Sequence, residues 1–582
     1  MNQVNIIKKE IEKLKSKPNL KNYDQEYAQF NWSDAEKQID FFQDGKLNIA
    51  YNCVDRHAFS SKKNKKALLF ESANGVKEEY SYLDLYKLTN KFANVLDNLS
   101  VKKGDRVFIF LPTIPERYVV FLGILKLGAI AGTMFSAFQE MALLDRLSDS
   151  GAKVLVTNSA LYPRIEKIWK DLPNLEKVII VERDSVDQSK GDRIHYYNHE
   201  MDLASDEFEA VHLNPDEPSY MLYTSGTTGK PKGVVHAHRD IVSAVATTKY
   251  VLDVKDDDIY WCTADLGWVT GVVYGVLGIF GLGGTSVAFE GKFSPSNWYR
   301  ILQDYRVSVW YTAPTAIRML MGSDILPRDY NLENLRFLGS VGEPLNPEAI
   351  WWGLEEFGLA FHDTWWQTEQ GAISITNFQS IDIKPGSMGK PFLGVNAAVI
   401  DDQGNELGIN QEGNLALKKD TVYSLMTGIW NNEEKYKSYF KNQWYISGDR
   451  AYRDEDGYFW FVGRADDVIK TSGERVGPFE VESALVENEN VVEAGVIGVP
   501  DDVRGEIIMA FVVLKPGILA SPELAEDLQK FVKQKLAGHA YPRKIKFIEK
   551  LPKTRSGKIM RRLLKAQELG LPLGDTSTLE DY

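Results

Sequence analysis

Cysteine is scarce in this sequence. Only Cys53 and Cys262 occur among 582 residues, and no CxxC pair is present. This excludes a disulfide framework and a zinc site built from several cysteines. Such usage is typical of a reducing compartment, so we expect a cytoplasmic location. The first residues also lack the apolar stretch of a secretory signal, which agrees with that expectation.

An excess of positive charge is also absent. The chain has 68 Lys and Arg against 81 Asp and Glu, which gives a net charge of −13. Binding to duplex nucleic acid depends on basic residues that neutralise phosphates, so nucleic acid is not an expected partner. Apolar residues make up 44% and charged residues 26% of the chain. These values are ordinary for a globular protein and exclude a disordered, collagenous or coiled-coil chain.

Long apolar runs are rare, and one exception needs an explanation. Residues 266–289 contain no charged side chain, and these 24 residues are enough to cross a bilayer. The run holds seven glycines, and Asp265 and Glu290 flank it. We therefore expect a buried helix followed by a strand, and no membrane partner.

Short β-branched runs alternate with helical patterns over most of the chain. The expected strands are 106–110, 153–157, 177–181, 220–223, 307–311 and 336–339, with helices such as 82–96 and 116–127 between them. This alternation predicts an α/β protein with mainly parallel sheets packed with helices. After about residue 385, closely spaced strands and turns indicate an antiparallel, barrel-like unit. The last 115 residues or so suit a small α+β domain.

The densest motif is YTSGTTGKPKG at residues 223–233. Its glycines allow close approach of the backbone, its hydroxyls donate hydrogen bonds, and its lysines neutralise charge, so we expect a phosphate-binding loop. It follows an expected strand and precedes an expected helical stretch. It is not a Walker A loop, because two residues instead of four separate Gly226 and Gly229 and Pro231 follows Lys230.

This loop resembles that of the adenylate-forming acyl-CoA synthetase superfamily, and further motifs follow in the same order. They are YTAPT at 311–315, SVGEP at 340–344, DTWWQTE at 363–369, SGD at 447–449, GRADD at 463–467 and LPKTRSGK at 551–558. The superfamily joins a carboxylate to AMP, releases pyrophosphate, and passes the acyl group to a thiol. The resemblance covers the chain from about residue 20 to its end.

The resemblance implies a domain organisation. We expect an N-terminal extension at 1–45, a large adenylation domain at 46–465 with a distorted β-barrel subdomain at about 385–463, and a small mobile C-terminal domain at 466–582. The hinge is expected at 464–467, with Asp466 as its pivot. Rotation of the small domain would separate the two half-reactions.

The resemblance also implies the site residues. Lys558, Glu369 and Thr368 are expected to be catalytic, with Glu369 holding Mg2+. The residues expected to bind ATP or AMP are Thr224, Ser225, Gly226, Thr227, Thr228, Gly229, Lys230, Gly342, Glu343, Pro344, Asp363, Thr364, Trp365, Trp366, Gln367, Thr368, Asp449, Arg464 and Arg475. Because the substrate carboxylate itself attacks ATP, the protein's work is positioning and charge neutralisation.

Two segments resemble those of the acetate-activating members of the superfamily. They are WCTADLGWVTG at 261–271 and the Trp pair at 365–366. The expected acetate pocket consists of Trp268, Val269, Thr270, Val341 and Trp366, where a Trp wall leaves room for little more than a methyl group. The expected activity is that of an ATP-dependent acetate–CoA ligase. The alternative is a ligase for propionate or another short or medium-chain acid.

Contacts with coenzyme A are implied less directly. Ser472, Gly473, Lys533 and Arg164 fall near positions that contact coenzyme A in relatives. Lys533 stands where some relatives have Arg, which weakens a bidentate phosphate contact. Lysines in the loop of Lys558 are targets of reversible acetylation in the superfamily, so a protein acetyltransferase and a deacetylase are expected partners.

Two further hypotheses come from other functional classes. The first is a module that loads a carrier protein, but only 24 residues follow Lys558. The second is a nucleotide-binding sensor without turnover, against which the joint presence of Lys558 and Glu369 counts. Gln370 and Ala372 depart from the Thr and Gly usual in the superfamily and lie next to the expected Mg2+ ligand.

Overall fold

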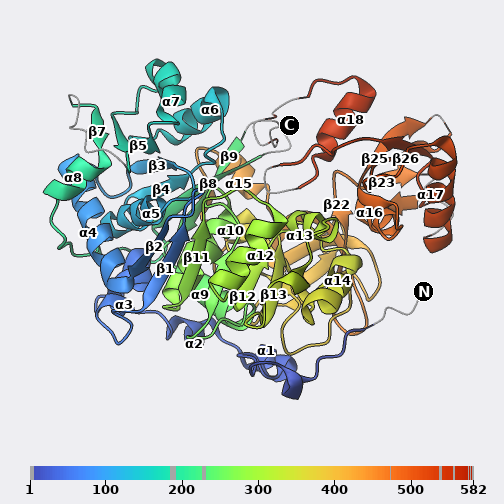
Figure 1. Cartoon of the computed structure of the whole chain (residues 1–582), viewed down its shortest axis with the longest axis horizontal. Helices are drawn as coiled ribbons and strands as arrows, with labels where there is room; N and C mark the ends of the chain where they lie inside the picture. The colour runs from blue at the N-terminus through green and yellow to red at the C-terminus, as the bar shows by residue number, and fades with distance from the viewer. Residues whose placement is uncertain are drawn as a thin grey trace.

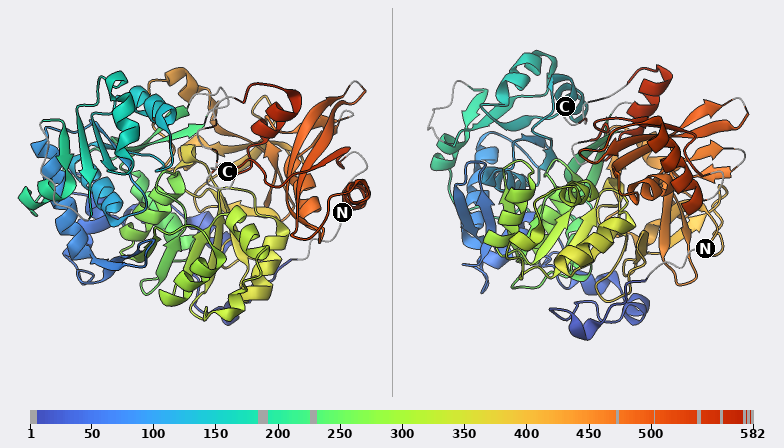
Figure 2. Two further views of the ribbon diagram at one scale, coloured as in Figure 1. Left: turned by 45° about the horizontal axis from the view of Figure 1, so that its top comes forward. Right: turned by 45° about the vertical axis from the view of Figure 1, so that its right-hand side comes forward.

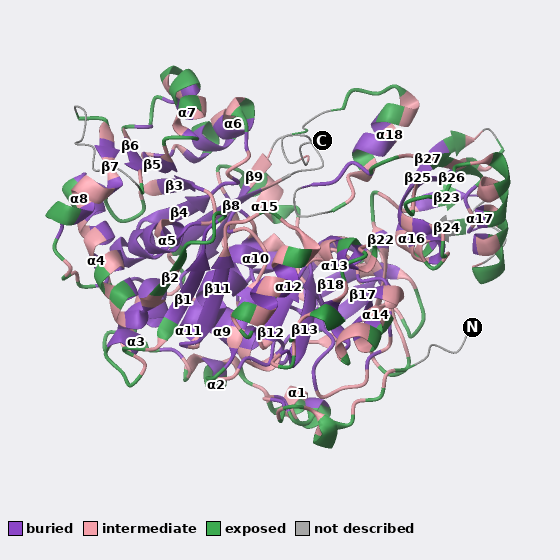
Figure 3. Ribbon diagram, viewed as in Figure 1, coloured by how far each residue is buried: buried purple, intermediate pink, exposed green. Residues whose placement is uncertain are grey.

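The computed structural model describes residues 6–183, 192–225, 231–471, 474–501, 503–536, 540–554, 558–573, 576 and 579. Three β-sheets and their covering helices make up the described chain (Figure 1). Most strands are purple in Figure 3, because their side chains are buried between layers of helices. The exposed residues lie mainly on helices and loops at the surface.

The first sheet has eight strands in the order β19-β9-β8-β4-β3-β5-β6-β7. Its central strands pair in parallel, as the alternation of strands and helices predicts, whereas β9 and β19 run antiparallel at one edge. The strands are β3 (Arg106–Phe110), β4 (Ile130–Thr133), β5 (Val154–Asn158), β6 (Lys177–Val181), β7 (Ile194–Tyr196), β8 (Pro218–Ser225), β9 (Pro231–Ala237) and β19 (Gly428–Ile429).

The second sheet has 14 strands and is parallel in one part and antiparallel in the other. The parallel part contains β1 (Lys66–Glu71), β10 (Ile259–Cys262), β11 (Thr285–Phe289), β12 (Val309–Thr312), β13 (Phe337–Val341) and β14 (Phe361–Trp365), with β2 (Lys77–Ser81) antiparallel at its edge. The antiparallel part contains β15 (Ile375–Thr376), β16 (Ser387–Pro391), β17 (Ala397–Ile400), β18 (Gly413–Lys418), β20 (Phe440–Lys441), β21 (Trp444–Arg453) and β22 (Phe459–Arg464).

The antiparallel strands confirm the predicted change from parallel to antiparallel structure after about residue 385. They do not form the predicted barrel. Among the described residues, β17 ends the sheet and pairs with β18 only. At the other side of this group, β16 pairs with β15, which continues into the parallel part. A closed barrel would need a free edge on β16 to pair with β17. Because β16 pairs with β15 instead, these strands extend the large sheet.

The third sheet belongs to a small C-terminal unit that lies at one side of the molecule, in orange and red (Figures 1 and 2). It contains β23 (Ile469–Thr471), β24 (Glu474–Val476), β25 (Val491–Asp501), β26 (Gly505–Leu514) and β27 (Lys544–Phe547). Its helices are α16 (Pro478–Val486), α17 (Pro522–Lys535) and α18 (Arg561–Leu569). The elements agree with the small α+β domain that the sequence predicts.

The other helices cover the two larger sheets. They are α1 (Tyr23–Gln29), α2 (Trp32–Glu36), α3 (Arg56–Ala58), α4 (Tyr82–Asn98), α5 (Pro115–Leu127), α6 (Glu140–Ser150), α7 (Tyr162–Ile168), α8 (Tyr197–Leu203), α9 (Asp240–Tyr250), α10 (Val269–Val272), α11 (Gly278–Gly281), α12 (Pro295–Asp304), α13 (Pro314–Met321), α14 (Pro347–Phe357) and α15 (Glu433–Lys437). The N-terminal segment packs on the antiparallel strands, where Trp32 Nε1 donates to the Thr421 carbonyl at 3.1 Å.

The uncharged run at 266–289 is a broken helix followed by a strand. It forms α10, a π-helical turn at Val273–Leu277, α11 and then β11, all of them almost fully buried. Gly278 lies against α9, where an added Cβ would come within 2.9 Å of the Ala244 carbonyl oxygen. Among the described residues, no helix has the length and apolar character that a membrane span requires.

Candidate active site

The predicted phosphate-binding loop connects two antiparallel strands. Thr224 and Ser225 end β8, and Ser225 pairs in register with Pro231 at the start of β9. The expected helical stretch directly after the loop is therefore wrong: the β-branched GVVHA segment returns beside β8, and helix α9 begins only at Asp240. The predicted ATP-binding residues from Gly226 to Lys230 lie outside the described residues.

Lys232 and Glu369 bring this hairpin next to the DTWWQTE motif. Lys232 Nζ lies 2.9 Å from Glu369 Oε1, and both side chains are mostly buried. Tyr439 donates to the same oxygen at 3.1 Å, and its ring lies under the Lys232 ammonium group at 4.6 Å. Both contacts use Oε1, and they fix the orientation of the carboxylate.

Asp449 accepts three hydrogen bonds at the end of the SGD motif. Trp365 Nε1 and Gln367 Nε2 donate to Oδ2 at 2.9 and 3.0 Å, and Arg464 donates to Oδ1 at 3.0 Å. Tyr445 in turn donates to Gln367 Oε1 at 2.8 Å. Burial raises the pKa of Asp449, and the Arg464 charge offsets part of this rise. The network joins DTWWQTE, SGD and GRADD in one place.

The SVGEP motif at residues 340–344 contains three of the residues predicted to bind ATP or AMP. Gly342 has φ of +95°, a conformation that glycine adopts readily. Glu343 accepts from Thr315 Oγ1 at 2.7 Å and from Arg318 at 2.8 Å. Beside it, Thr364 donates to the Ser340 carbonyl at 2.7 Å. These contacts fix Glu343 against α13 and join β13 to β14, and Pro344 follows Glu343 in the chain.

Asp363 is a buried carboxyl group at the start of this motif. Burial raises its pKa to about 7, although the Thr364 N–H donates to Oδ1 at 3.0 Å and favours the ionised form. Asp363 lies within β14, directly before Thr364 and Trp365.

The predicted acetate residues divide into two groups. Val269, Val341 and the partly buried Trp366 belong to one hydrophobic cluster, and Thr270 is buried next to Val269 in α10. Trp268 packs elsewhere: it belongs to a second cluster and contacts the Phe135 ring edge at a centroid distance of 4.5 Å.

Tyr274 orients Trp366 in this cluster. The two rings meet edge-to-face at 5.1 Å. The Tyr274 hydroxyl accepts from the Ile373 N–H at 2.8 Å and lies 2.9 Å from Thr247 Oγ1. Two hydrogen-bond partners thus fix the aromatic ring against which the Trp366 wall is packed.

Lys558 lies on the small unit within electrostatic reach of this network. Its side chain is exposed, yet the surrounding protein desolvates the ammonium group enough to lower its pKa. Arg464 adds to this lowering, and the carboxylates of Asp449 and Asp467 oppose it. The Lys558 backbone is tied to Thr554, whose Oγ1 accepts from the Lys558 N–H at 3.1 Å.

Direct contacts join the small unit to the large one. Asn346 donates to Ser483 Oγ at 2.8 Å. Arg318 of the large unit lies 3.7 Å from Glu493 Oε1 of the small unit. Within the small unit, Lys553 donates to Glu493 Oε2 at 2.6 Å. The connection between the units runs from β22 in the large sheet to β23 in the small sheet, and Asp466 is exposed in it.

The residues predicted to contact coenzyme A are spread over the chain. Ser472 and Gly473 lie outside the described residues, and for Arg475 only its position in β24 is described. Lys533 is exposed on α17 with its ammonium group 5.3 Å from the Tyr541 ring centre. Arg164 on α7 donates to the carbonyls of Ser136 and Phe138 at 2.9 Å each.

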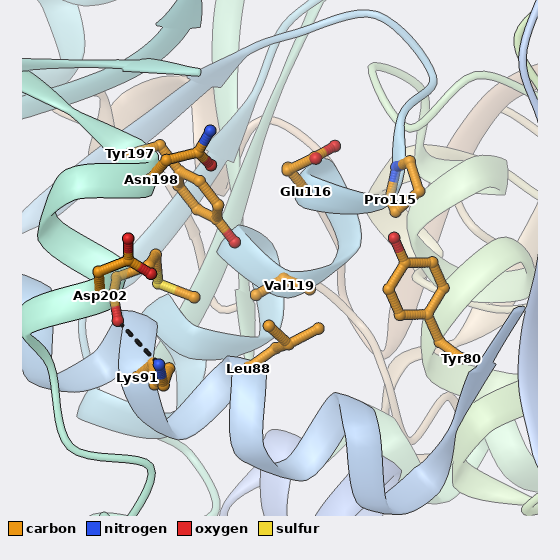
Figure 4. Close-up of a pocket in the computed structure, with 10 residues that line it drawn as sticks. Tyr80, Leu88, Lys91, Pro115, Glu116, Val119, Tyr197, Asn198 and Asp202 are labelled. Carbon is orange, nitrogen blue, oxygen red and sulfur yellow. Dashed lines mark hydrogen bonds between the residues drawn. The ribbon is translucent and has the colours of Figure 1, made fainter. Parts of the chain in front are cut away.

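A cavity of about 360 Å³ lies away from these residues, between α4, α5 and α8. Figure 4 shows Lys91 and Asp202 on one side of it and Glu116 and Tyr80 on the other. Lys91 donates to the Met201 carbonyl at 3.0 Å, and Arg183 pairs with Glu116 at 2.9 Å. None of its lining residues belongs to the motifs that converge around Asp449 and Glu369.

Several residues of the site were not predicted from the sequence. Lys232 lies in the YTSGTTGKPKG motif. Its charge and its position in this motif were sufficient to predict it as a phosphate-binding residue. Tyr439, Tyr445 and Tyr274 belong to none of the motifs. They could not be predicted as site residues, because a lone tyrosine in an apolar stretch is most often a core residue. In the folded chain, Tyr439 contacts Glu369, Tyr445 contacts Gln367, and Tyr274 contacts Trp366.

Two family models match the chain. The model described as AMP-binding enzyme matches residues 54–430, and the model described as AMP-binding enzyme C-terminal domain matches residues 480–558. These matches define the class: an enzyme with a large AMP-binding part and a separate C-terminal part. The boundary between the two matches falls in the segment that contains the connection from β22 to β23.

Curated relatives narrow this class. The chain is 52% identical over 566 residues to acetyl-coenzyme A synthetase of Bacillus subtilis (strain 168), covering 97% of this chain and 98% of that one. It is 44% identical to acetyl-coenzyme A synthetase of Methanothrix thermoacetophila, with coverage of 93% and 86%. The chain therefore belongs to the acetyl-coenzyme A synthetase family of AMP-binding enzymes.

Solved structures agree with the fold. The Brucella canis acyl-CoA synthetase has a TM-score of 0.73 and 35% identity, covering 95% of this chain and 99% of that one. The anthranilate CoA ligase AuaEII, solved in complex with anthranoyl-AMP, has a TM-score of 0.83 and 29% identity, with coverage of 93% and 99%. The α/β architecture with a small C-terminal domain is thus shared with acyl-CoA synthetases.

Proposed function

We propose that this chain is an AMP-forming acetate–CoA ligase that works in two steps. Acetate attacks the α-phosphorus of ATP, which gives acetyl-AMP and pyrophosphate. The thiol of coenzyme A then attacks the acetyl carbon, which gives acetyl-CoA and releases AMP. The observation that carries the proposal is the convergence of Glu369 with Lys232 and of Asp449 with Arg464 and Lys558, in a chain related over nearly its full length to acetyl-coenzyme A synthetases.

The first step needs charge neutralisation more than proton transfer. Acetate and ATP are both anions, so cationic groups must lower their repulsion as they approach. Lys232 pairs with Glu369, Arg464 pairs with Asp449, and Lys558 lies within electrostatic reach of Asp449, so each can supply positive charge to bound anions. Thr368, beside Glu369, offers a hydroxyl to the α-phosphate. Asp449 suits the two ribose hydroxyls, because a carboxylate accepts from both.

Glu369 is the residue that we propose to hold Mg2+. The donor set fits this ion, because Mg2+ in nucleotide sites takes one or two protein carboxylates and fills its shell with phosphate oxygens and water. Among the described residues, no group of three or more His, Cys, Asp or Glu side chains is placed to hold a metal ion. When bound, Mg2+ would neutralise charge on the triphosphate.

Binding of ATP is expected to depend on Asp449. Replacement by Asn keeps the shape but removes the charge that holds Arg464 and accepts from the ribose. We expect the KM for ATP to rise by about 10–100-fold, because a hydrogen bond to a charged group is lost. The measurement is pyrophosphate release at varied ATP, with the exposed Asp420→Asn as the matched control. An unchanged KM in Asp449→Asn would show that this carboxylate does not bind the nucleotide.

The second step requires a different position of the small domain. We propose domains at 1–45, 46–465 and 466–582, with the hinge at 464–467. The described position suits the first step, because the charge of Lys558 acts on Asp449. Coenzyme A would then bind where Ser472, Gly473, Lys533 and Arg164 can reach it after rotation.

Asp466→Pro tests the hinge. Proline fixes φ and restricts the preceding residue, so rotation is blocked. We expect pyrophosphate release to persist, whereas acetyl-CoA formation from supplied acetyl-AMP falls roughly tenfold or more. Asp466→Ala is the control, since it removes the carboxylate but keeps the rotation free. Equal losses in both half-reactions of Asp466→Pro would contradict the hinge.

The acid specificity is tested with a panel of substrates. Pyrophosphate release from Mg-ATP is measured with acetate, propionate, butyrate or hexanoate, each with and without coenzyme A. Rapid release with acetate that needs coenzyme A for sustained turnover is the expected result. A preference for propionate or hexanoate would favour a ligase for longer acids, and release that depends on a carrier protein would favour a loading module. A thermal shift with ATP but no release would indicate a sensor.

We further propose that the enzyme works in the cytoplasm and that Lys558 is acetylated reversibly. The low cysteine content supports the first point. The exposure of Lys558 supports the second, because a modifying enzyme can reach an exposed amine. Acetylation removes the positive charge and should block the first step.

A further inference from the structure

A buried histidine lies directly behind the turn that carries Thr368 and Glu369. His236 is near the end of β9, and Asp240 begins α9. His236 Nδ1 lies 2.6 Å from Asp240 Oδ2, and His236 Nε2 lies 2.8 Å from the Thr368 carbonyl oxygen. The two side chains are 0% and 1% exposed. The Tyr220 ring stacks on His236 at 4.8 Å.

The partners of His236 fix where its protons lie. The Thr368 carbonyl can only accept, so Nε2 carries a hydrogen and donates. Nδ1 faces a carboxylate oxygen at hydrogen-bond distance, so a proton must lie between them, either on the imidazole or on Asp240. In both cases, Asp240 holds the ring in the orientation that directs Nε2–H at Thr368.

The turn that His236 contacts is short, and hydrogen bonds from neighbouring segments hold its carbonyl groups. Thr368–Gln370 form a single 3-10 turn without a side-chain cap. The Glu369 carbonyl accepts from the Met426 N–H at 2.9 Å, and Ser424 donates to the Gln370 carbonyl at 2.8 Å. The Thr368 carbonyl accepts from the Gly371 N–H at 3.2 Å within the turn and from His236 Nε2 outside it, so each of the three consecutive carbonyls has a partner outside the turn.

We propose that His236 is a positioning residue for the first half-reaction. Its Nε2–H bond to the Thr368 carbonyl sets the turn so that the Thr368 hydroxyl and the Glu369 carboxylate face the phosphates. Asp240 acts through His236 by fixing the ring. This inference rests on the proposed function, because it assigns a task to a support of Thr368 and Glu369.

Two substitutions of His236 separate this role from simple packing. In His236→Gln, the side-chain amide nitrogen reaches the region of Nε2 and can donate to Thr368. In His236→Asn, the shorter amide reaches only the region of Nδ1, so the contact with Asp240 is kept and the bond to Thr368 is lost. Asp240→Asn is the third variant, because its amide can still donate to Nδ1 while the ring keeps Nε2–H.

Each variant is assayed in both half-reactions, with Tm measured alongside. We expect His236→Asn to lose about 10–100-fold in kcat/KM for acetate-dependent pyrophosphate release, as for the loss of a residue that orients a metal ligand. It should also need more Mg2+ for half-maximal rate. His236→Gln and Asp240→Asn should stay within about fivefold of the wild type, well below that loss. Acetyl-CoA formation from supplied acetyl-AMP should change little in all three.

The outcomes separate this inference from the proposed function. A wild-type chain without acetate-dependent pyrophosphate release would refute the proposed function. With an active wild type, the positioning role is refuted if His236→Asn matches His236→Gln, or if both half-reactions fall together with Tm. If His236→Asn does not fold, the other two variants decide: a large loss of pyrophosphate release in folded Asp240→Asn would overturn the proposal.

Discussion

Replacing Lys558 by Ala is expected to reduce acetate-dependent pyrophosphate release about 1,000-fold, the upper range for the loss of one charged group that stabilises a transition state. The Lys558 side chain is a cationic group that the small domain brings within electrostatic reach of Asp449. Its charge acts on Asp449 and Arg464 of the large domain. Without the Lys558 ammonium group, the negative charge that develops as acetate attacks ATP is less well neutralised. We propose that this group is near the phosphates only in the described position of the small domain.

The second half-reaction is the internal control for Lys558. Acetyl-CoA formation from supplied acetyl-AMP should stay near the wild-type rate, because we propose that the small domain has then rotated away. Lys558→Gln, which has the neutral side chain of an acetylated lysine, should behave like Lys558→Ala. The exposed Lys544→Ala should leave both half-reactions unchanged. A Lys558→Ala variant that still releases pyrophosphate at the normal rate would remove the lysine from the catalytic machinery.

Replacing Trp366 by Gly is expected to change the preferred acid. The indole packs edge-to-face on Tyr274 and lies with Val269 and Val341 in one cluster. Its removal opens space where a longer acyl chain can lie. We expect activity with butyrate and hexanoate to rise and activity with acetate to fall, with a change in their kcat/KM ratio of about 100-fold or more, since each methylene is worth 10–200-fold.

The control for Trp366 is a tryptophan outside the pocket. Trp351 is partly exposed on α14, so Trp351→Gly should keep the acetate preference. Tm is compared for both variants, because loss of Trp366 also removes the ring contact with Tyr274. A wild-type enzyme that already prefers hexanoate, or a Trp366→Gly variant with an unchanged acid profile, would refute the steric account of specificity.

Much of the fold follows from local pattern. The strands at 106–110 and 177–181 occur at the predicted bounds, because β-branched runs between turn residues identify buried parallel strands well. The loop after β8 shows the limit of this approach. Its return as β9 depends on pairing between residues on both sides of the loop, such as Ser225 and Pro231. The open edge at β17 depends likewise on long-range pairing, which local sequence does not specify.

The site shows the same division. The resemblance of the ordered motifs to those of the superfamily implied that Glu369, Asp449 and Lys558 share one site. His236 and Tyr274 gave no such signal, because a buried histidine or tyrosine in a β-branched stretch is typical of core packing. Their tasks become visible only when the chain brings Thr368 and Trp366 against them. Trp268, which was also predicted for the pocket, packs on Phe135 in a different hydrophobic cluster from Trp366.

The most direct test of the account is exchange of labelled pyrophosphate into ATP in the absence of coenzyme A. If acetate and ATP form acetyl-AMP reversibly at this site, label will enter ATP only when acetate and Mg2+ are present, and Asp449→Asn and Lys558→Ala will lower the exchange. Exchange that is independent of acetate, or none at all from a folded and ATP-binding enzyme without coenzyme A, would contradict an acetyl-AMP intermediate and with it the proposed mechanism.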